Sequence, residues 1–488
     1  MGITRRWLFT ACRFVVLAGL IATATPASVY AQDAIPTIED AELVFGQGVD
    51  AFESGDYETA HRRFRVVFET YELNRKTTAA LLMAAKALYR ADRFEEAVDL
   101  SERLIEEYPS SGYLEEARRV RRLANGQLDR EAARREPREI GVLLPLRDDD
   151  ATLSQALFTG VRIAVDEHNR LNEEHPVRLV FRDTYANPSR APSLVRELAA
   201  ADVDVLIGPL YSSEAMAAAE AAELARVVLV APLANNEAVS EGREYVFQAN
   251  PTFTMRGRLM ARFAMRGLLL DNFGIIAERD PEQISERMAE GFQDELMLSG
   301  KQTHYYRLLQ SQNDWGQLAD TVGADTLGRA EAVYLPIAGG ESIARIDAAL
   351  SSFDRMGMSN QIRVLGNTEW HDAPNASRAS RYATTYSNDF YVEGEDASVR
   401  AFSRRFEEIV GEAPDPENTI GRLAYTGYDL TRYLLPLITS GSASNLSDRI
   451  HAASTYQGLG IRLDFSRGNV NEALYYFRYQ DGRLRMLR

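Results

Sequence analysis

The chain has 488 residues, of which 45% are hydrophobic and 26% charged, and its formal net charge is −16. This length exceeds what one hydrophobic core organises, and it predicts about three units of roughly 100 to 200 residues each. The acidic excess argues against binding to nucleic acid or to anionic membrane surfaces, because both need positive charge on the protein.

The first 31 residues have the pattern of an export signal. Paired arginines precede an apolar segment over residues 14–22 (FVVLAGLIA), and small residues that a signal peptidase accepts end at Ala31. We expect cleavage there and a periplasmic protein, with the Sec and twin-arginine routes both open. Cys12 is the single cysteine and lies in this segment, so no disulfide or thiolate site is expected in the mature chain. No later stretch has the ~20 apolar residues of a membrane span.

Residues 32–136 are predicted to form a helical repeat domain. The stretch GDYETA, which starts at Gly55, recurs 37 residues later within ADRFEEA over residues 91–97. In each copy an alanine follows an aromatic residue by three positions, and this small side chain allows a paired helix to approach closely. These stretches resemble tetratricopeptide repeats, and the domain is a candidate surface for a protein partner.

From Ile140 onward, strand patterns alternate with helix patterns. Short apolar strands are expected near 140–146, 177–183, 203–208 and 227–234, separated by amphipathic helices. A second series of the same kind begins after Asn250-Pro251, with helices near 284–298 and 342–356. Alternating strands and helices predict parallel sheets with right-handed crossovers, so two α/β lobes are expected. The chain is expected to end in a hairpin with turns at residues 466–469 and 480–482.

The order of these elements, together with particular phrases, resembles the type I periplasmic solute-binding proteins of the leucine/isoleucine/valine-binding family. The phrases that carry the resemblance are Ile140–Leu146 with Gly160–Ala164, Leu206–Ser213, Val228–Asn235, Val246–Pro251, Leu365–Trp370, Ala424–Asp429 and Tyr456–Gly460 with Leu463–Phe465. The resemblance implies one binding module over residues 137–488. Its first lobe would span about 138–250 and 386–450, and its second lobe about 251–385 with part of the C-terminal segment.

The same resemblance implies that the two lobes close on a small amino-acid-like or carboxylate ligand, for an ABC-type membrane permease or for sensing. Ligands of parallel sheets bind beyond the carboxyl ends of the strands, and a helix start there offers free N–H groups to a carboxylate. The implied contacts of the first lobe are Tyr211, Ser212, Ser213, Ala234 and Asn235. Those of the second lobe are Glu369, which would pair with an ammonium group, and Trp370, which would pack on an apolar part.

Three observations leave room for a function other than the capture of a small ligand. Serine is a preferred N-cap residue, so Ser212 and Ser213 have an equally simple interpretation as caps of their own helix. Residues 279–282 (RDPE) stand where the resembled family carries a Tyr-Gly phrase beside its ligand. The order of a repeat domain before a binding module also resembles the activators of penicillin-binding proteins, which stimulate peptidoglycan synthesis through protein contacts. A non-catalytic scaffold of that type is therefore the alternative function.

The sequence contains no phosphate-binding loop, dinucleotide turn or zinc-protease pair, so no cofactor, metal or enzyme activity is predicted. The stretch GESIA around Ser342 differs by one residue from a nucleophile elbow, and we do not expect Ser342 to be catalytic. Acidic residues 148–150 are interpreted as a solvated loop in preference to a cation site.

Overall fold

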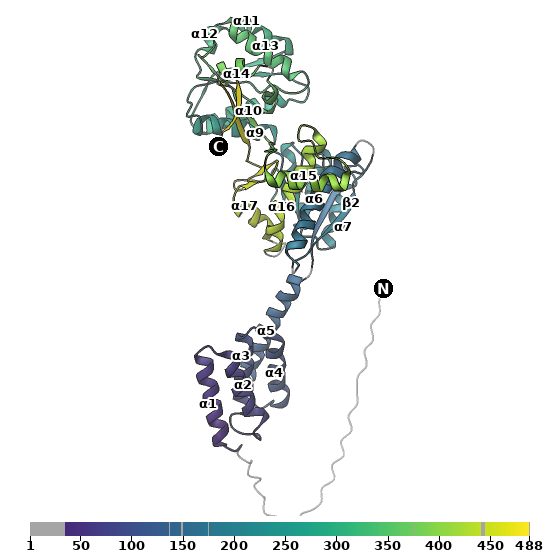
Figure 1. Ribbon diagram of the computed structural model, residues 1–488, viewed down its shortest axis with the longest axis vertical. Coiled ribbons are helices and arrows are strands. Elements are labelled where there is room, and N and C mark those ends of the chain that lie inside the picture. The colour runs from purple at the N-terminus through teal and green to yellow at the C-terminus, as the bar shows by residue number, and fades with distance from the viewer. Residues whose placement is uncertain are drawn as a thin grey trace, which may run out of the picture. The chain divides into compact units, whose positions relative to one another are not determined.

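The computed structural model describes residues 35–135, 137–147, 150–173, 175–373, 375–440 and 445–487 (Figure 1). The chain divides into two compact units, residues 1–132 and 133–488, which are treated separately below. The expected export signal over residues 1–31 lies outside the described residues. Among those that are described, no helix has the length and apolar character needed to span a membrane.

The first unit consists of antiparallel helices joined by short turns. They are α1 (Glu39–Glu53), α2 (Tyr57–Glu69), α3 (Thr77–Arg90), α4 (Phe94–Glu107) and α5 (Leu114–Arg135), the last of which continues past the unit's end. Successive helices pack on one another through a shared apolar core. These helical hairpins correspond to the two sequence copies predicted from the 37-residue offset.

The turn at equivalent positions of the two copies has the same backbone conformation. Gly55 ends the first turn with φ +83°, and Asp92, at the matching position in the second copy, has φ +57°. Both values lie in the left-handed region, in which glycine is the least strained residue and Asp is tolerated. Ala60 and Ala97, the small residues of each copy, are fully buried, as close helix packing requires.

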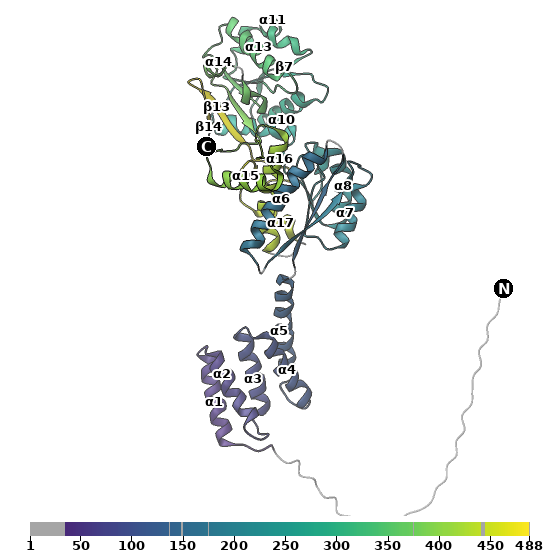
Figure 2. The ribbon, with the colours of Figure 1, turned by 45° about the vertical axis from the view of Figure 1, so that its right-hand side comes forward.

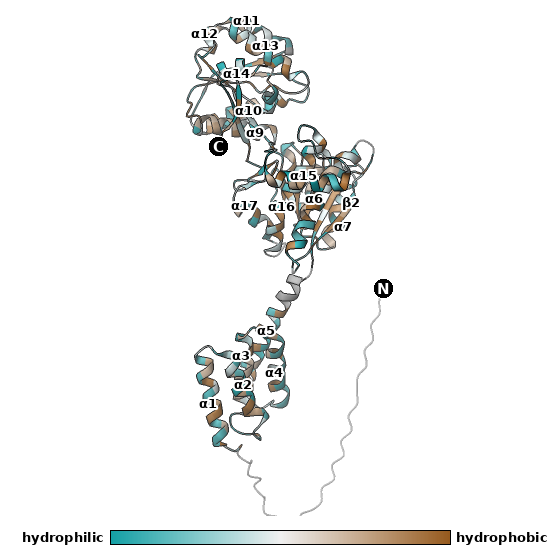
Figure 3. Cartoon of the chain, viewed as in Figure 1, coloured by the Kyte–Doolittle hydropathy of each residue, from teal (hydrophilic) through white to brown (hydrophobic). Residues whose placement is uncertain are grey.

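The first lobe of the second unit is built on a parallel five-stranded sheet in the order β2-β1-β3-β4-β5. Its strands are β1 (Arg138–Leu144), β2 (Val177–Asp183), β3 (Val205–Ile207), β4 (Val228–Ala231) and β5 (Val246–Gln248). One face carries α7 (Ala191–Ala200) and α8 (Ser212–Ala225), and the other carries α6 (Asp150–Leu171), α15 (Ala397–Val410), α16 (Thr419–Thr439) and α17 (Leu446–Ala452). Figure 3 shows the strands mostly in hydrophobic colours and the covering helices in mixed colours, as a sheet covered on both faces requires.

The second lobe contains a seven-stranded sheet in the order β14-β13-β10-β9-β8-β6-β7, parallel except at its C-terminal strands. The strands are β6 (Phe273–Glu278), β7 (Thr303–Leu309), β8 (Ala332–Tyr334), β9 (Arg363–Gly366), β10 (Thr385–Asn388), β13 (Tyr475–Gln480) and β14 (Arg483–Leu487). Its principal helices are α9 (Phe253–Arg266), α10 (Ile284–Leu298) and α13 (Ser342–Arg355), with the short α11 (Leu318–Thr321), α12 (Ala324–Leu327) and α14 (Ala376–Arg381). The 3-10 turns of the unit are η1 (Glu237–Val239), η2 (Gln312–Gln317) and η3 (Thr368–Asp372).

Each lobe contains a helix pair that packs through reciprocal glycines. A Cβ on Gly160 of α6 would lie 2.0 Å from the carbonyl oxygen of Ala424, and one on Gly427 of α16 would lie 2.1 Å from that of Leu157. Figures 1 and 2 show α6 and α16 side by side. In the second lobe, Gly257 of α9 and Gly291 of α10 are in contact with the partner helix in the same way. The helix backbones approach so closely that only glycine fits at these positions.

The chain crosses between the lobes three times. The first crossing is at Asn250-Pro251, the second follows β10, and the third lies between β12 (Arg462–Leu463), which pairs with β11 (Tyr456–Gln457), and β13. Since β10 pairs with β9 and β13, residues 385–388 belong to the second sheet, whereas the sequence places the return to the first lobe at about residue 386.

Of the two expected C-terminal turns, only the one at residues 480–482 closes an antiparallel hairpin, between β13 and β14. The segment after residues 466–469 forms no strand ladder with β12, although Glu472 N–H donates to Asp464 O (2.9 Å) and Asn471 Nδ2 to Arg462 O (2.7 Å). Val470 instead forms a bridge with Gln248 at the end of β5, and Asn471 Nδ2 donates to Ala249 O (2.9 Å). Hydrogen bonds to the first lobe therefore hold this segment beside β5.

Candidate ligand-binding site between the lobes

The start of α8 is joined to the loop after β4. Ser212 Oγ accepts a hydrogen bond from the backbone N–H of Asn235 (3.2 Å) and lies 3.4 Å from Asn235 Oδ1. No side chain caps the first turn of α8, so Ser212 links two loops and does not act as the cap of its own helix. Ser213 is exposed, whereas Ala234 is buried and its carbonyl oxygen accepts from Gln248 Nε2.

Tyr211 is half-buried and directs its hydroxyl toward α6. The hydroxyl donates to Asp150 Oδ1 at 2.5 Å. Burial, followed by the hydrogen bond and the charge of Asp150, raises the pKa of Tyr211 to about 12. Asp150 is the one residue of the acidic 148–150 stretch that the structure describes, and Tyr211 is its partner. Within the described residues, no cluster of His, Cys, Asp or Glu could hold a metal ion.

Glu369 and Trp370 are neighbours in η3 but have different environments. Glu369 is half-buried, and its Oε2 accepts a hydrogen bond from Ser342 Oγ at 2.7 Å. Trp370 is fully buried in the core of the second lobe, with its Nε1 donating to Leu335 O at 3.1 Å. Trp370 thus offers no surface to the space between the lobes, and its contribution is to support the turn that carries Glu369.

Ser342 lacks the arrangement of a catalytic serine. Its hydroxyl donates directly to the Glu369 carboxylate, and His371 Nδ1 bonds instead to the hydroxyl of Tyr386 (2.7 Å). A serine nucleophile needs a base, usually histidine, in hydrogen-bond reach of its hydroxyl, with a third group orienting that base. These residues therefore do not form a triad.

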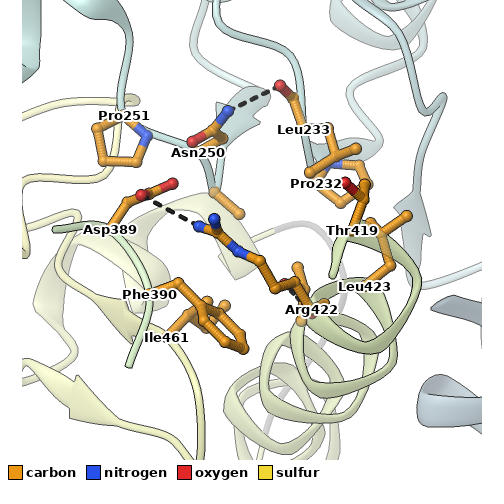
Figure 4. Close-up of a pocket in the computed structure, with 12 residues that line it drawn as sticks. Pro232, Leu233, Asn250, Pro251, Asp389, Phe390, Thr419, Arg422, Leu423 and Ile461 are labelled. Carbon is orange, nitrogen blue, oxygen red and sulfur yellow. Dashed lines mark hydrogen bonds and ion pairs between the residues drawn. The ribbon is translucent and has the colours of Figure 1, made fainter. Parts of the chain in front are cut away.

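A cavity of about 140 Å³ lies where the first two crossings meet α16 (Figure 4). The loop after β4, the two crossings, the start of α16 and the loop after β11 all contribute to it. Its lining is mostly apolar, with one ion pair: Pro232, Leu233, Ala249, Asn250, Pro251, Asp389, Phe390, Thr419, Arg422, Leu423, Thr426 and Ile461. We call this the hinge pocket.

Asp389 forms ion pairs with two arginines at the hinge pocket. Its carboxylate accepts from Arg256 Nη2 of α9 at 3.0 Å and from Arg422 Nη2 of α16 at 3.2 Å (Figure 4 draws the latter). Burial alone would raise the pKa of Asp389, but the charges of Arg256 and Arg422 outweigh it and lower the pKa to about 2. Arg256 also donates to Asn250 Oδ1 (2.8 Å) and to Pro251 O (3.1 Å). Arg256 therefore connects both the first crossing, at Asn250-Pro251, and the second crossing, at Asp389, to α9 of the second lobe.

A second cavity of about 330 Å³ adjoins the hinge pocket and shares Phe390 and Arg422 with it. We call it the outer pocket. Residues of both lobes line it: Ser342, Ile343, Thr368, Glu369, His371, Asp372, Asn388, Phe390, Tyr391, Val392, Pro416, Glu417 and Arg422. The two pockets thus adjoin at these two side chains, and the lining of the hinge pocket is the more apolar of the two.

Asp429 fixes the loop that supplies Ile461 to the hinge pocket. Its carboxylate accepts from the backbone N–H groups of Leu459 (2.8 Å), Gly460 (2.7 Å) and Ile461 (3.0 Å). Burial raises the pKa of Asp429 to about 6, although the three N–H donors act in the opposite direction. Within the Ala424–Asp429 phrase of the sequence, Asp429 thus positions the loop before β12 and is not itself among the residues that line the hinge pocket.

The structure brings only part of the predicted site together. Glu369 lines the outer pocket, and the loop before Asn235 lines the hinge pocket through Pro232 and Leu233. Arg422 lines both pockets and Asp389 lines the hinge pocket, and neither residue was predicted. The available signal for Arg422 was a charged residue in the first turn of the helix, and that for Asp389 was an acidic residue directly after a strand.

Residues 137–483 match a family model described as periplasmic binding protein. The chain belongs to the periplasmic binding protein family. The resemblance and the two-lobed fold expected from the sequence are thereby confirmed. Residues 37–156 match a second model, described as outer membrane lipoprotein, which covers the helical repeats and the beginning of the binding module.

Solved structures show the same periplasmic binding protein fold. A putative branched-chain amino acid ABC transporter protein from Rhodospirillum rubrum has a TM-score of 0.57 at 18% identity, over 72% of this chain and 100% of its own. A branched-chain amino acid ABC transporter periplasmic ligand-binding protein from Burkholderia xenovorans has a TM-score of 0.52 at 17% identity, over 72% and 94%. At such identities the likeness concerns the fold alone. A comparison with curated protein sequences found no match.

Proposed function

We propose that this chain is a periplasmic, non-catalytic binding protein that captures a small zwitterionic or carboxylate solute between its lobes. The observation that carries the proposal is the pair of adjoining hinge and outer pockets, whose linings come from both lobes and from the crossings between them. Concave sites at domain interfaces, mostly apolar with a few converging polar groups, are typical of small-molecule binding. The captured solute would pass to an ABC-type permease or report to a sensor, and the N-terminal segment would direct export.

The proposal includes the ligand contacts that were predicted from the sequence. Ser212, Ser213 and Asn235 line neither pocket, and in this proposal they would form a polar wall of the first lobe that meets the solute on closure, supported from behind by Tyr211 and Ala234. Glu369 would face them from the second lobe, while Trp370 would hold η3 in position. Closure would be a rigid-body movement of the lobes about the three crossings, which absorb the change in backbone angles.

A thermal-shift screen of residues 32–488 against amino acids and small organic acids tests the proposal. Since a ligand that binds only the folded state stabilises it by RT ln(1 + [L]/Kd), a bound solute at 100 times its Kd adds about 2.7 kcal/mol. Since the unfolding entropy grows with chain length, this shifts the Tm of a module of about 350 residues by roughly 4 °C. A solute that binds by closure should also reduce the radius of gyration in small-angle X-ray scattering. The absence of any shift across the screen would contradict the proposal.

A second candidate function is supported by the surface of the helical repeats. Large apolar side chains are exposed on the first unit: Leu43 (64%), Leu73 (50%), Leu123 (46%) and Tyr113 (44%). Exposed apolar groups of this kind can mark protein-interaction sites. The chain would then act as an envelope scaffold or as an activator of a peptidoglycan synthase. Stimulation of a purified synthase by the full mature chain, abolished by charged substitutions at Leu43 and Leu73, would support this function.

A further inference from the structure

Strand β14 is the edge strand of the seven-stranded sheet and lies beside β13 (Figure 2). Backbone groups of successive residues in a strand point to opposite sides. Tyr479 N–H of β13 donates away from β14, to Thr384 O, and the register partner of Tyr479 in β14 is Leu484. Leu484 and Met486 therefore direct their N–H and C=O groups to the open side of β14. Within the described part of the chain no strand pairs with that side, and such an edge is a template for an added strand.

One face of β14 presents arginines with little counter-charge. Arg483 and Arg485 are exposed, and Arg485 lies directly opposite Arg478 of β13. Like charges that face each other in this way destabilise a sheet. Burial, followed by the charge of Arg363 on β9, lowers the pKa of Arg478. Among the described residues, the one carboxylate paired with this group is that of Asp481, which is 3.9 Å from Arg485 Nη2. This face therefore attracts anions.

The opposite face of β14 is apolar. Leu484 and Met486 are 36% and 37% exposed, and they lie beside buried aromatic residues of β13. A cavity of about 620 Å³ adjoins this end of the strand, and its lining includes Met486, Tyr391, Leu459 and Tyr475. In peptides that bind as an added strand, backbone hydrogen bonds give affinity, and pockets for alternate side chains give specificity. An apolar side chain next to Met486 would cover the rim of this cavity.

We propose that β14 binds an extended acidic segment of a partner protein, which adds to the sheet as a further strand. The segment forms backbone hydrogen bonds with Leu484 and Met486. Because side chains alternate between the two faces, acidic residues at every second position lie beside Arg483 and Arg485. The residues between them lie beside Leu484 and Met486, so the segment alternates acidic and apolar residues. This interaction goes beyond solute capture and does not depend on it.

Two other occupants fit β14 less well. Pairing with the β14 strand of a second copy sets arginine either against arginine or against leucine and methionine, so charge and apolar surface remain unmatched. An anionic membrane extends beyond β14 and would meet the remainder of a chain whose formal net charge is −16. A short acidic segment interacts mainly with charges within a Debye length of about 8–10 Å, so the arginines of β14 dominate its binding.

Fluorescence anisotropy of residues 32–488 with labelled synthetic peptides tests the proposal. The probe is a peptide of four Glu-Val repeats. One control has glutamine in place of glutamate, and the other has the same composition as a block of glutamates followed by a block of valines. We expect the alternating peptide to bind at least tenfold more tightly than either control. It should also slow hydrogen exchange at Leu484 and Met486. Equal binding of the block peptide would overturn the added strand, equal binding of the glutamine peptide would overturn the role of the arginines, and no binding of the alternating peptide would overturn both.

The double variant Arg483→Gln/Arg485→Gln tests the charge contact. Arg196→Gln/Arg404→Gln is the matched control, because both of these arginines are exposed on helices of the first lobe. We expect the first variant to bind the alternating peptide at least tenfold more weakly and the control less than twofold. Unchanged affinity in the first variant would contradict the proposal. A dimer of the wild-type chain in sedimentation velocity that this variant dissociates would assign β14 to a second copy and overturn the partner segment. Either result leaves the proposed function intact, since the thermal-shift screen for solutes does not involve β14.

Discussion

Asp389 and Arg256 form an ion pair of 3.0 Å that joins the second crossing to α9, the first helix of the second lobe. Both side chains are largely buried, at 16% and 15% exposure. Arg422 adds the first lobe to the same carboxylate. A single acidic side chain therefore connects both lobes at the point about which we propose that they move.

Replacing Asp389 with Asn should destabilise the binding module. The change leaves Arg256 and Arg422 close together without their shared counter-charge, and removal of one partner from a buried pair costs about 3–5 kcal/mol. Urea denaturation followed by tryptophan fluorescence measures the loss. Asp325→Asn, on an exposed helix of the second lobe, is the control and should change stability by less than about 0.5 kcal/mol.

The Asp389 carboxyl should also make the stability of the binding module fall at acid pH. Its pKa is about 2 in the folded protein against 3.8 as a free group, so folding favours the charged form. The stabilisation is fully present above about pH 4 and is lost as the pH falls toward 2, with a total of about 2 kcal/mol. In Asp389→Asn this part of the pH dependence should disappear between pH 4 and 2. If the variant lost stability between pH 4 and 2 as steeply as the wild type, the assignment of this pKa to the ion pair would be contradicted.

Replacing Gly427 with Ala should force α16 away from α6. Because the new Cβ would lie 2.1 Å from the carbonyl oxygen of Leu157, a backbone and not a flexible side chain must move. Overpacking of this kind costs about 1–3 kcal/mol, which differential scanning calorimetry would detect as a lower Tm. Gly394→Ala, where the added Cβ meets nothing within 4 Å, is the matched control and should leave the Tm unchanged.

Asp429→Asn should loosen the loop at residues 459–461 and with it the wall of the hinge pocket. Oδ2 of the carboxylate accepts from both Gly460 and Ile461. An amide in the same place either turns its NH₂ group toward these N–H donors or leaves the Leu459 N–H facing that group, so at least one buried donor loses its acceptor, at a cost of about 1–3 kcal/mol. Faster hydrogen exchange at residues 459–461 would report it. The exposed Asp448→Asn, on α17, should leave the exchange there unchanged.

The sequence by itself determined the kinds of element and their order. The 37-residue offset predicted the paired helices, because buried alanines and turn residues recur wherever the same hairpin recurs. Apolar runs separated by amphipathic helices predicted two parallel sheets, because a strand covered on both faces needs apolar residues along its whole length. These properties depend on neighbours along the chain, which a single sequence records directly.

Only the tertiary structure decided which side chains meet at the crossings. Asp389 is 33 positions from Arg422 and 133 positions from Arg256, so no local sequence pattern predicts either contact. Trp370 and Glu369 are adjacent in sequence, yet one is buried in the core and the other lines a cavity, because η3 turns successive side chains to different sides. Likewise β10 joins the second sheet through hydrogen bonds to β9 and β13, which depend on where distant strands end. Partner choice over such separations follows from packing, which is why the sequence predicted the lobes but not the arginine between their pockets.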